Sequence, residues 1–140
     1  MKTIKFTITT PERTVYSEDV EQVTIPTKMG EITVLPGHIP LAAGLVAGEL
    51  RALKSGQEMS MAVSGGFVEV LPEAVTILAD SAEHAHEIDE AKAEEARARA
   101  VALLSVKHVD AEEFAVLSAQ MERELARLKV ARKKKYRDVR

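Results

Sequence analysis

Two histidines and two glutamates lie close together in the segment Glu83-His84-Ala85-His86-Glu87. Imidazole and carboxylate groups bind zinc and other transition metals, but a structural zinc site needs four ligands at defined spacing. Two imidazoles separated by one residue supply only part of such a set. We therefore interpret this segment as a solvated linker and predict no metal site.

A second candidate is His38, which has the right chemistry for a general base. Its neighbours in Leu35-Pro36-Gly37-His38-Ile39-Pro40 are apolar residues and prolines, with no Ser, Cys or Asp to complete a nucleophile and base pair. The two prolines exclude a helix here, and Gly37 is able to take a positive φ. We predict a stiff loop that serves as an interface and not as a catalytic site.

Glycine-rich stretches are the third candidate, because such loops cradle phosphates. The stretches Gly44-Leu45-Val46-Ala47-Gly48 and Gly65-Gly66 lack both the phosphate-loop lysine and the strand-then-helix setting of a dinucleotide fingerprint. The chain also has no cysteine, which excludes thiol catalysis, disulfides and thiolate metal sites. We predict that the glycines form turns and that no residue is catalytic.

The elements that position these residues change character near Ala85. Up to Leu78 the apolar residues alternate with polar ones, as in Ile4, Phe6 and Ile8, and turn residues recur at short intervals. This pattern predicts eight to ten short strands, with a tight turn at 64–66, in an all-β sandwich or barrel over residues 1–85. Residues 86–140 then form a separate helical unit, so the whole chain is α+β.

The helical unit is predicted to be an antiparallel hairpin of two helices. Asp89 and Asp110 stand at positions suited to N-caps, and the segment between Ala91 and Leu104 has neither Gly nor Pro. One face of the first helix is predicted to carry small and apolar residues, and one stripe of the second helix is predicted to meet it. The first set is Ala93, Ala96, Ala100 and Leu103, and the second is Phe114, Leu117, Met121, Leu125 and Leu128.

Charge is distributed unevenly along the 140 residues, whose formal net charge is −3. Residues 123–140 hold nine basic and two acidic residues and form a cationic arm. Three interpretations of the arm remain open: a solvated helix end, a nucleic-acid contact, or docking on an acidic protein surface. Aromatic residues are scarce in the arm and the preceding domain is acidic, which disfavours nucleic acid.

Membrane insertion is not expected. The uncharged run at 39–48 contains a proline and two glycines and is far shorter than the ~20 residues of a membrane-spanning helix. The N-terminus alternates polar and apolar residues, so no secretory signal is predicted. Any association with a membrane is therefore expected through a protein partner.

Three blocks of the sequence carry a family resemblance. They are Gly30-Glu31 followed by Leu35-Pro36-Gly37-His38-Ile39-Pro40-Leu41, then Val63-Ser64-Gly65-Gly66-Phe67-Val68-Glu69-Val70, then Val75-Thr76-Ile77-Leu78-Ala79-Asp80 with Ala82-Glu83. In this order and spacing the chain resembles the epsilon subunits of bacterial rotary F-type ATP synthases. The resemblance implies a β-sandwich of about ten strands, a C-terminal helical hairpin, and a non-catalytic role on the central stalk with no required cofactor.

That resemblance also implies partners and a location. Epsilon subunits join the gamma subunit to the c-ring at the cytoplasmic face of the cell (inner) membrane, and their helices inhibit ATP hydrolysis by docking on the catalytic alpha and beta subunits. The residues implied for the c-ring and gamma contact are Glu31, Leu35, Pro36, Gly37, His38 and Pro40. Those implied for inhibitory docking on beta are Arg123, Arg127, Arg132, Lys133, Lys134 and Lys135.

Some bacterial relatives also bind regulatory ATP through an Ile/Leu-Asp-x-x-Arg-Ala motif. The matching segment is Ile88-Asp89-Glu90-Ala91-Lys92-Ala93, in which Lys92 replaces the arginine and loses its planar fork. Arg99, Arg123 and Arg127 match the other positions of that site. The alternative is that Asp89 only caps the helix.

Two further classes of function stay open from the residues alone. The chain is either a stalk subunit, a free-standing nucleotide-sensing module, or a small β-domain enzyme. A stable complex with a gamma subunit is expected only of the first.

Overall fold

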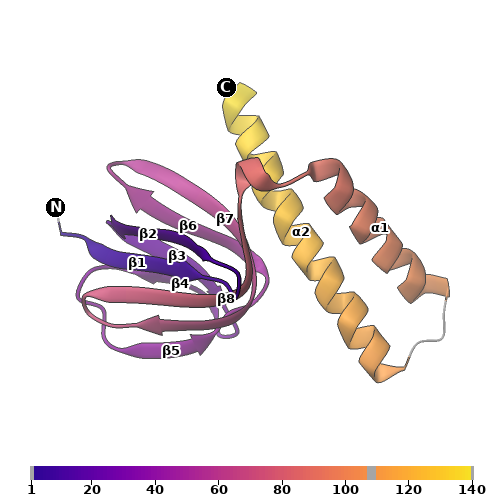
Figure 1. The fold of residues 1–140 in the computed structure, drawn as a ribbon, viewed down its shortest axis with the longest axis horizontal. Coiled ribbons are helices and arrows are strands. Elements are labelled where there is room, and N and C mark those ends of the chain that lie inside the picture. The colour runs from indigo at the N-terminus through magenta and orange to yellow at the C-terminus, as the bar shows by residue number, and fades with distance from the viewer. Residues whose placement is uncertain (1, 107–109, 140) are drawn as a thin grey trace.

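The computed structural model describes residues 2–106 and 110–139, and it places a β-sandwich beside a helical hairpin (Figure 1). The expected α+β architecture is confirmed. Eight strands come first, a short 3-10 turn marks the junction, and two helices follow. The elements are β1 Ile4–Thr9, β2 Thr14–Val20, β3 Gln22–Thr27, β4 Gly30–Val34, β5 Leu41–Gly44, β6 Gly48–Lys54, β7 Gln57–Val70, β8 Ala74–His84, η1 Ala85–Glu87, α1 Glu90–Val106 and α2 Ala111–Val139.

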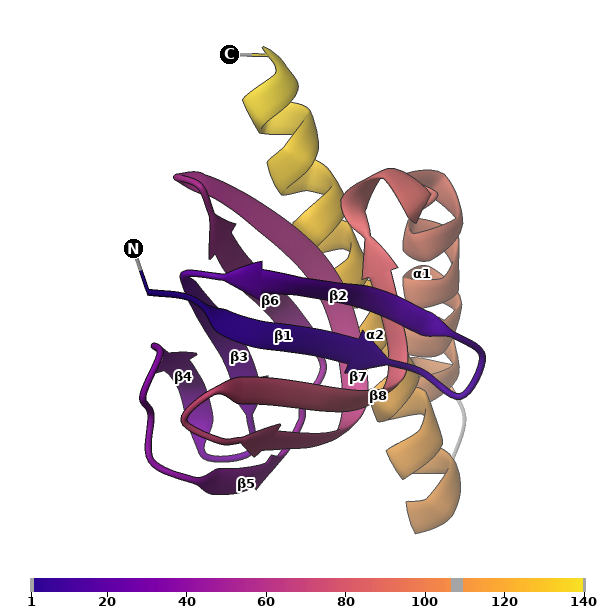
Figure 2. The same cartoon turned by 60° about the vertical axis from the view of Figure 1, so that its left-hand side comes forward.

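The strands are hydrogen-bonded in the order β2-β1-β8-β7-β6-β3-β4, and β5 pairs with β7. All of these pairs are antiparallel except β1 with β8, which run parallel with Phe6 opposite Val75. The sheet closes over itself into two layers, seen most clearly in Figure 2. The alternation of Ile4, Phe6 and Ile8 works as expected, because all three side chains are buried in the core between the layers.

The tight turn predicted at 64–66 is wrong. Strand β7 continues through this point, with Gly65 and Gly66 at φ values of 60° and 111°. Before the glycines β7 pairs with β6, and after them it pairs with β5, so the glycines bend one long strand from one layer to the other. Because β7 is not divided at the glycines, the described sandwich has eight strands, which is the lower end of the predicted eight to ten.

Both helices begin where the sequence predicted a cap. Asp89 accepts a hydrogen bond from the backbone amide of Lys92 at 3.1 Å, and Asp110 accepts one from Glu113 at 2.8 Å. These bonds satisfy amides that have no partner within the helix, which stabilises each helix by about 1 kcal/mol.

Helix α2 packs against β6 and β7 on one side and against α1 on the other (Figure 1). The alanines expected on the inner face of α1 are buried at positions 93, 96 and 100, but Leu103 is 40 % exposed. The stripe expected on α2 is only partly right, because Leu128 is buried while Phe114 and Leu125 are 56 % and 46 % exposed.

Two buried faces on α2 explain the incorrect stripe. The sequence prediction assumed one apolar face, whereas the structure buries Glu124 and Leu128 as well as Ala126 and Val130. Successive members of that set differ by two residues, which places them on nearly opposite sides of a helix. A helix buried on two sides shows no single stripe in its sequence.

Candidate interaction surfaces

The histidine segment at the junction is ordered by local contacts. The side chain of Glu87 accepts a hydrogen bond from the backbone amide of His84 at 3.0 Å and pairs with Arg13 at 3.0 Å. The rings of His84 and His86 stack with centroids 5.4 Å apart. Within the described residues no three His, Cys, Asp or Glu side chains are placed to hold a metal ion.

Glu31 lies at the start of β4, directly after the Lys28-Met29 turn that joins β3 and β4, and we call this end of the strand with its turn the Glu31 turn. The Thr27 hydroxyl donates to the carbonyl of Gly30 at 2.6 Å and accepts from the amide of Met29 at 3.2 Å, and Gly30 has a φ of 102°. These bonds fix the turn, and Met29 is left 67 % exposed at its tip. The side chain of Glu31 is half exposed and is available to a partner.

The Leu35 to Pro40 loop follows at the other end of β4. Gly37 takes the positive φ that the sequence predicted, at 85°, and its amide donates to the carbonyl of Pro72 at 2.8 Å. The His38 Nδ1 atom lies 2.6 Å from the carbonyl oxygen of Ile39, so this nitrogen is held as a donor. The bond orients the ring and leaves Nε2 with its lone pair, so the interface role of His38 stays a prediction.

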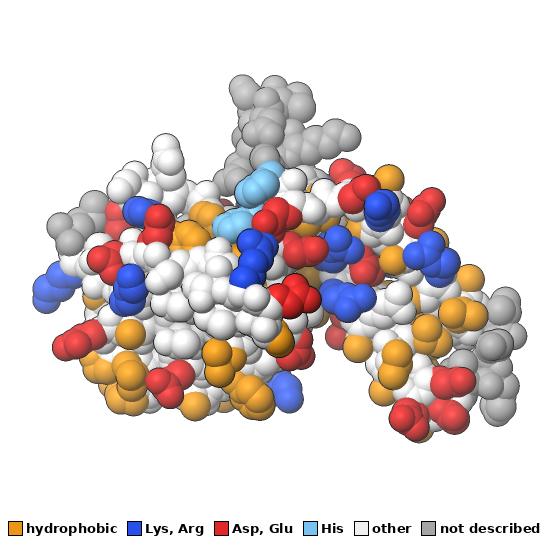
Figure 3. Space-filling view, in the orientation of Figure 1, with side chains coloured by type: hydrophobic (Ala, Val, Ile, Leu, Met, Phe, Trp, Pro, Cys, Tyr) orange, Lys and Arg blue, Asp and Glu red, His pale blue; other side chains and the backbone are white. Residues whose placement is uncertain are grey.

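Exposed hydrophobic side chains lie on that loop and, separately, on strands β7 and β8. Leu35 and Ile39 are 53 % and 75 % exposed, and Phe67 and Leu78 are directly opposite each other on β7 and β8. Figure 3 shows hydrophobic side chains gathered along the lower edge of the sandwich, where β5 lies in Figure 1. An apolar surface on a stiff loop loses little conformational entropy on binding, which suits a protein partner.

The basic residues predicted for docking are paired within the chain. Arg127 pairs with Glu83 and Glu124, and Arg123 lies 3.6 Å from Glu124. On the other side of α2, Arg132 pairs with α1. Figure 3 shows opposite charges side by side along the boundary between sandwich and helices.

At the end of α2, Lys133 pairs with Glu49 and Glu58 of the sandwich. The side chains of Lys134 and Lys135 lie outside the described part of the structure. Arg127, Arg132 and Lys133 therefore support a compact form of the hairpin through pairs with other elements. Arg123 contacts only Glu124 of its own helix and is 47 % exposed.

Sequence reasoning missed two charged residues on the outer face of β6. Glu49 is almost fully buried beneath α2, and Arg51 bridges it to Glu31. Burial lowers the pKa of the Arg51 guanidinium, but its hydrogen bonds with Glu31 and Glu49 outweigh burial and raise the pKa above its usual value. Alternation with the buried Leu50 places both residues on the outer face of β6, but that pattern does not indicate that a helix covers this face.

The residues matched to an ATP site do not form an open cradle in this compact form. Asp89 is used as the cap of α1, and the guanidinium of Arg127 is occupied by two carboxylates. Lys92 and Arg99 are exposed, while Ile88 is partly buried at the junction. Binding of ATP by these residues stays a prediction.

Comparison with known families covers nearly the whole chain. Residues 3–85 match the β-sandwich domain of the ATP synthase delta/epsilon chain, and residues 86–132 match the long alpha-helix domain of the same chain. The chain belongs to the ATP synthase delta/epsilon family. The resemblance drawn from the three sequence blocks is thereby confirmed.

Individual members of the delta/epsilon family are similar over most of this chain. The ATP synthase epsilon chain of Dehalococcoides mccartyi is 47 % identical over 135 residues, which are 96 % of each chain. The epsilon chain of Bacillus subtilis is 52 % identical over 100 residues, which cover 71 % of this chain and 76 % of the relative.

Solved structures agree with this family. A chain in the Euglena gracilis mitochondrial ATP synthase, solved with OSCP, F1 and the c-ring, has a TM-score of 0.78 and 28 % identity over 92 % of this chain and 81 % of that chain. A chain in the central stalk and c-ring of the Tetrahymena thermophila enzyme shares the fold, with a TM-score of 0.67 and 14 % identity over 93 % and 97 % of the two chains. Neither described helix is long and apolar enough to cross a membrane.

Proposed function

We propose that this chain is a non-catalytic subunit of the central stalk of a proton-translocating ATP synthase. It joins the gamma subunit to the c-ring, so that proton flow and the production of ATP from ADP are coupled by rotation. The proposal is supported chiefly by the match of both epsilon domains, in order, over residues 3–132. The complex places the chain at the cytoplasmic face of the cell (inner) membrane as a peripheral component.

In this proposal the two loops beside β4 contact the rotor. The Glu31 turn meets the c-ring, and the Leu35 to Pro40 loop with its exposed hydrophobic side chains meets gamma. The turn and the loop are both fixed by backbone and hydroxyl hydrogen bonds, which supports their use as stiff contact points. Stiffness also suits the transmission of torque, because little displacement is lost within the loop.

The helical hairpin is the regulatory part of the proposal. Its contact with the sandwich includes ion pairs of Arg127 with Glu83 and of Lys133 with Glu58, and such partly exposed pairs are each worth about 2 kcal/mol or less. Such a contact separates more readily than a continuous apolar core. Once separated, the basic residues of α2 become available to the acidic surfaces of the beta subunits and inhibit ATP hydrolysis there.

Assembly with the rest of the enzyme tests this role. We expect the chain to copurify with gamma, and we expect deletion of residues 110–140 to raise ATP hydrolysis by the assembled enzyme. Because the chain has no native cysteine, a short thiol crosslinker between Glu83→Cys and Arg127→Cys is able to hold the hairpin compact. The crosslinked enzyme should hydrolyse ATP faster than the same double variant without the crosslink, which is its matched control. Unchanged hydrolysis at low ATP in both cases would overturn the inhibitory role.

A regulatory role for ATP is a second part of the proposal and has its own test. Binding at Asp89, Lys92, Arg99, Arg123 and Arg127, next to Ile88, requires phosphate oxygens to replace the carboxylates that now hold Arg127. Titration of the isolated chain with ATP should then shift the amide signals of these residues. If millimolar nucleotide produces no response, Asp89 acts only as a helix cap.

A further inference from the structure

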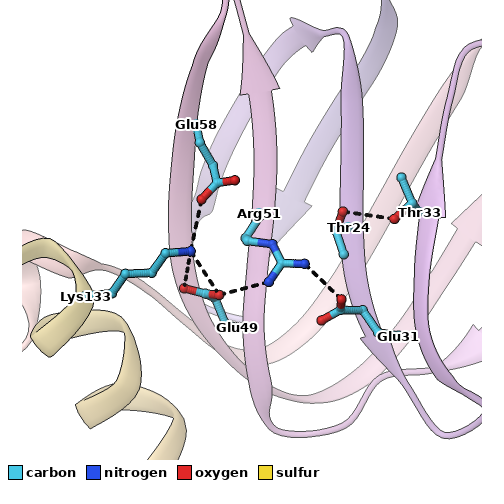
Figure 4. Close-up of polar contacts among 7 residues, drawn as sticks. All are labelled: Thr24, Glu31, Thr33, Glu49, Arg51, Glu58 and Lys133. Atoms are coloured by element: carbon cyan, nitrogen blue, oxygen red, sulfur yellow. Dashed lines mark hydrogen bonds and ion pairs between the residues drawn. The ribbon is translucent and has the colours of Figure 1, made fainter. Parts of the chain in front are cut away.

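Five charged side chains form a continuous row from the Glu31 turn to the end of helix α2 (Figure 4). Glu31 pairs with Arg51 at 2.8 Å, and Arg51 pairs with Glu49 at 3.2 Å. Lys133 of α2 lies 3.3 Å from the same Glu49 and 3.0 Å from Glu58. We call these five residues the charged row.

Glu49 is the centre of the charged row, and because it is buried its negative charge must be compensated by neighbouring groups. Its side chain is only 2 % exposed, and a carboxylate so buried needs cations or donors nearby. Arg51 and Lys133 supply them among the described residues. Two buried oxygens, Oε2 of Glu49 and the hydroxyl of Ser60, have no hydrogen-bond partner in the described structure. Among the described residues, the Oε2 atom is therefore compensated only by the ion-pair contact with Lys133 at 3.3 Å.

Arg51 divides its guanidinium between two carboxylates. Its Nη1 atom donates to Glu49 and its Nη2 atom donates to Glu31. The guanidinium is a planar fork that is able to bind one carboxylate with both ends. When Glu31 is engaged by a cation from outside the chain, both ends of the fork become available to Glu49. Glu49 then depends less on Lys133.

We propose that Arg51 couples the Glu31 turn to the docking of helix α2, so that capture of Glu31 by a cationic partner loosens the helix. Coupling between two sites is reciprocal, so release of α2 also draws Arg51 towards Glu49 and frees Glu31 for the partner. The coupling is a property of the chain alone. Its use in signalling from the c-ring to the hairpin rests on the proposed function.

The geometry explains why Glu31 is suited to this role. The side chain of Glu31 is 52 % exposed, whereas that of Arg51 is 27 % exposed. A partner therefore reaches Glu31 before Arg51. The less exposed Arg51 then turns its guanidinium from Glu31 towards Glu49. Strands β4, β3 and β6 are neighbours in the sheet, with Thr24 of β3 opposite both Thr33 and Arg51, so the response crosses only one strand.

Amide hydrogen exchange in the full-length isolated chain tests the coupling. Glu31→Gln removes the charge as a cationic partner would, and we expect exchange of the α2 amides at 126–133 to rise about two- to fivefold, the range for partly exposed ion pairs. Glu69→Gln, which neutralises an exposed carboxylate of β7 outside the charged row, should leave that exchange unchanged. Exchange of the β1 and β8 core amides reports that the sandwich stays folded.

Two backgrounds separate coupling from a local effect of Glu31. In Lys133→Gln, the α2 amides should already exchange faster, and adding Glu31→Gln should add nothing further. In Arg51→Lys, the charge remains but the fork is lost, and Glu31→Gln should again have no effect on α2. The proposal is overturned if Glu31→Gln leaves the exchange of the α2 amides unchanged in the native background. It is also overturned if Glu31→Gln raises that exchange equally in the native, Lys133→Gln and Arg51→Lys backgrounds. Neither outcome depends on assembly with an ATP synthase, so the proposed function is tested separately.

Discussion

Arg127 of α2 donates two hydrogen bonds to the carboxylate of Glu83 on β8, from Nε at 2.6 Å and from Nη2 at 3.3 Å. Its third donor, Nη1, binds Glu124 of the same helix at 2.8 Å. Burial lowers the pKa of Arg127, but its bonds with Glu124 and Glu83 outweigh burial and raise the pKa above its usual value. The pair with Glu83 therefore joins the sandwich to the hairpin by charge as well as by packing.

Loss of the Glu83 charge should loosen the hairpin without unfolding the sandwich. We expect Glu83→Gln to lower the free energy of docking of α2 by about 1–2 kcal/mol, because a two-bond charge-assisted contact at a partly buried site is broken. Amide exchange along α2 measures the change, and added salt should shrink the difference between native and variant chains. An equal effect from Glu69→Gln, on the same sandwich but away from α2, would show that the loss is not specific to this pair.

The bend in β7 yields a second prediction. A methyl group at Gly66 would overlap the backbone carbonyl oxygen of Leu78, and the φ of 111° is itself unfavourable for any other residue. We expect Gly66→Ala to destabilise the chain by about 3–5 kcal/mol, from backbone strain and overpacking together. Urea unfolding followed by circular dichroism measures this loss.

The turn between β6 and β7 provides the matched control for Gly66. Gly56 also has a positive φ, of 76°, but nothing lies within 4 Å of a methyl group built there. Gly56→Ala should therefore cost only the strain, about 1–2 kcal/mol. Similar losses for the two alanine variants would contradict the close approach of β7 and β8 at Gly66.

Acid should weaken the junction through Glu87. Burial raises the pKa of this carboxyl, but the backbone bond from His84 and the pair with Arg13 outweigh burial and lower the pKa below its ordinary value of 4.5. A carboxyl with a depressed folded-state pKa contributes stability above pH 4.5, and that stability is lost as the pH falls through the lower folded value. The melting temperature should therefore fall in this acid range.

The Glu87→Gln variant isolates this contribution. Its melting temperature should be lower than that of the native chain at neutral pH, and the two should converge as the pH falls below 4.5. If the difference between them is constant with pH, Glu87 does not supply the acid sensitivity.

Much of the sandwich is readable from the sequence because period-two alternation and turn residues are local signals. Ile4, Phe6 and Ile8 are buried as predicted. The turn predicted at 64–66 is instead a bend within β7, because a glycine pair signals a turn and a bend equally well. Only the long-range pairing of β7 with β8 distinguishes the two.

The charged contacts between the sandwich and the helices are less predictable because their partners lie far apart in the sequence. The stiff loop at 35–40 and both helix caps follow from residues within a few positions of each other. Glu49 meets Lys133 across 84 positions of sequence, so neither residue indicates the other. Basic residues that the sequence presents as an open arm are therefore partly used to hold the chain together.

The two buried sides of α2 distinguish a pair of leucines that the sequence treats alike. Leu128 is 1 % exposed and Leu125 is 46 % exposed, although both belong to the predicted stripe. Leu128→Ala leaves a cavity within the helical interface and should cost about 2–5 kcal/mol, whereas Leu125→Ala should cost under about 1 kcal/mol. Amide exchange along α2 measures both losses. A loss at Leu125 equal to that at Leu128 would mean that the hairpin in solution uses the single stripe, and that α2 does not lie between α1 and the sandwich.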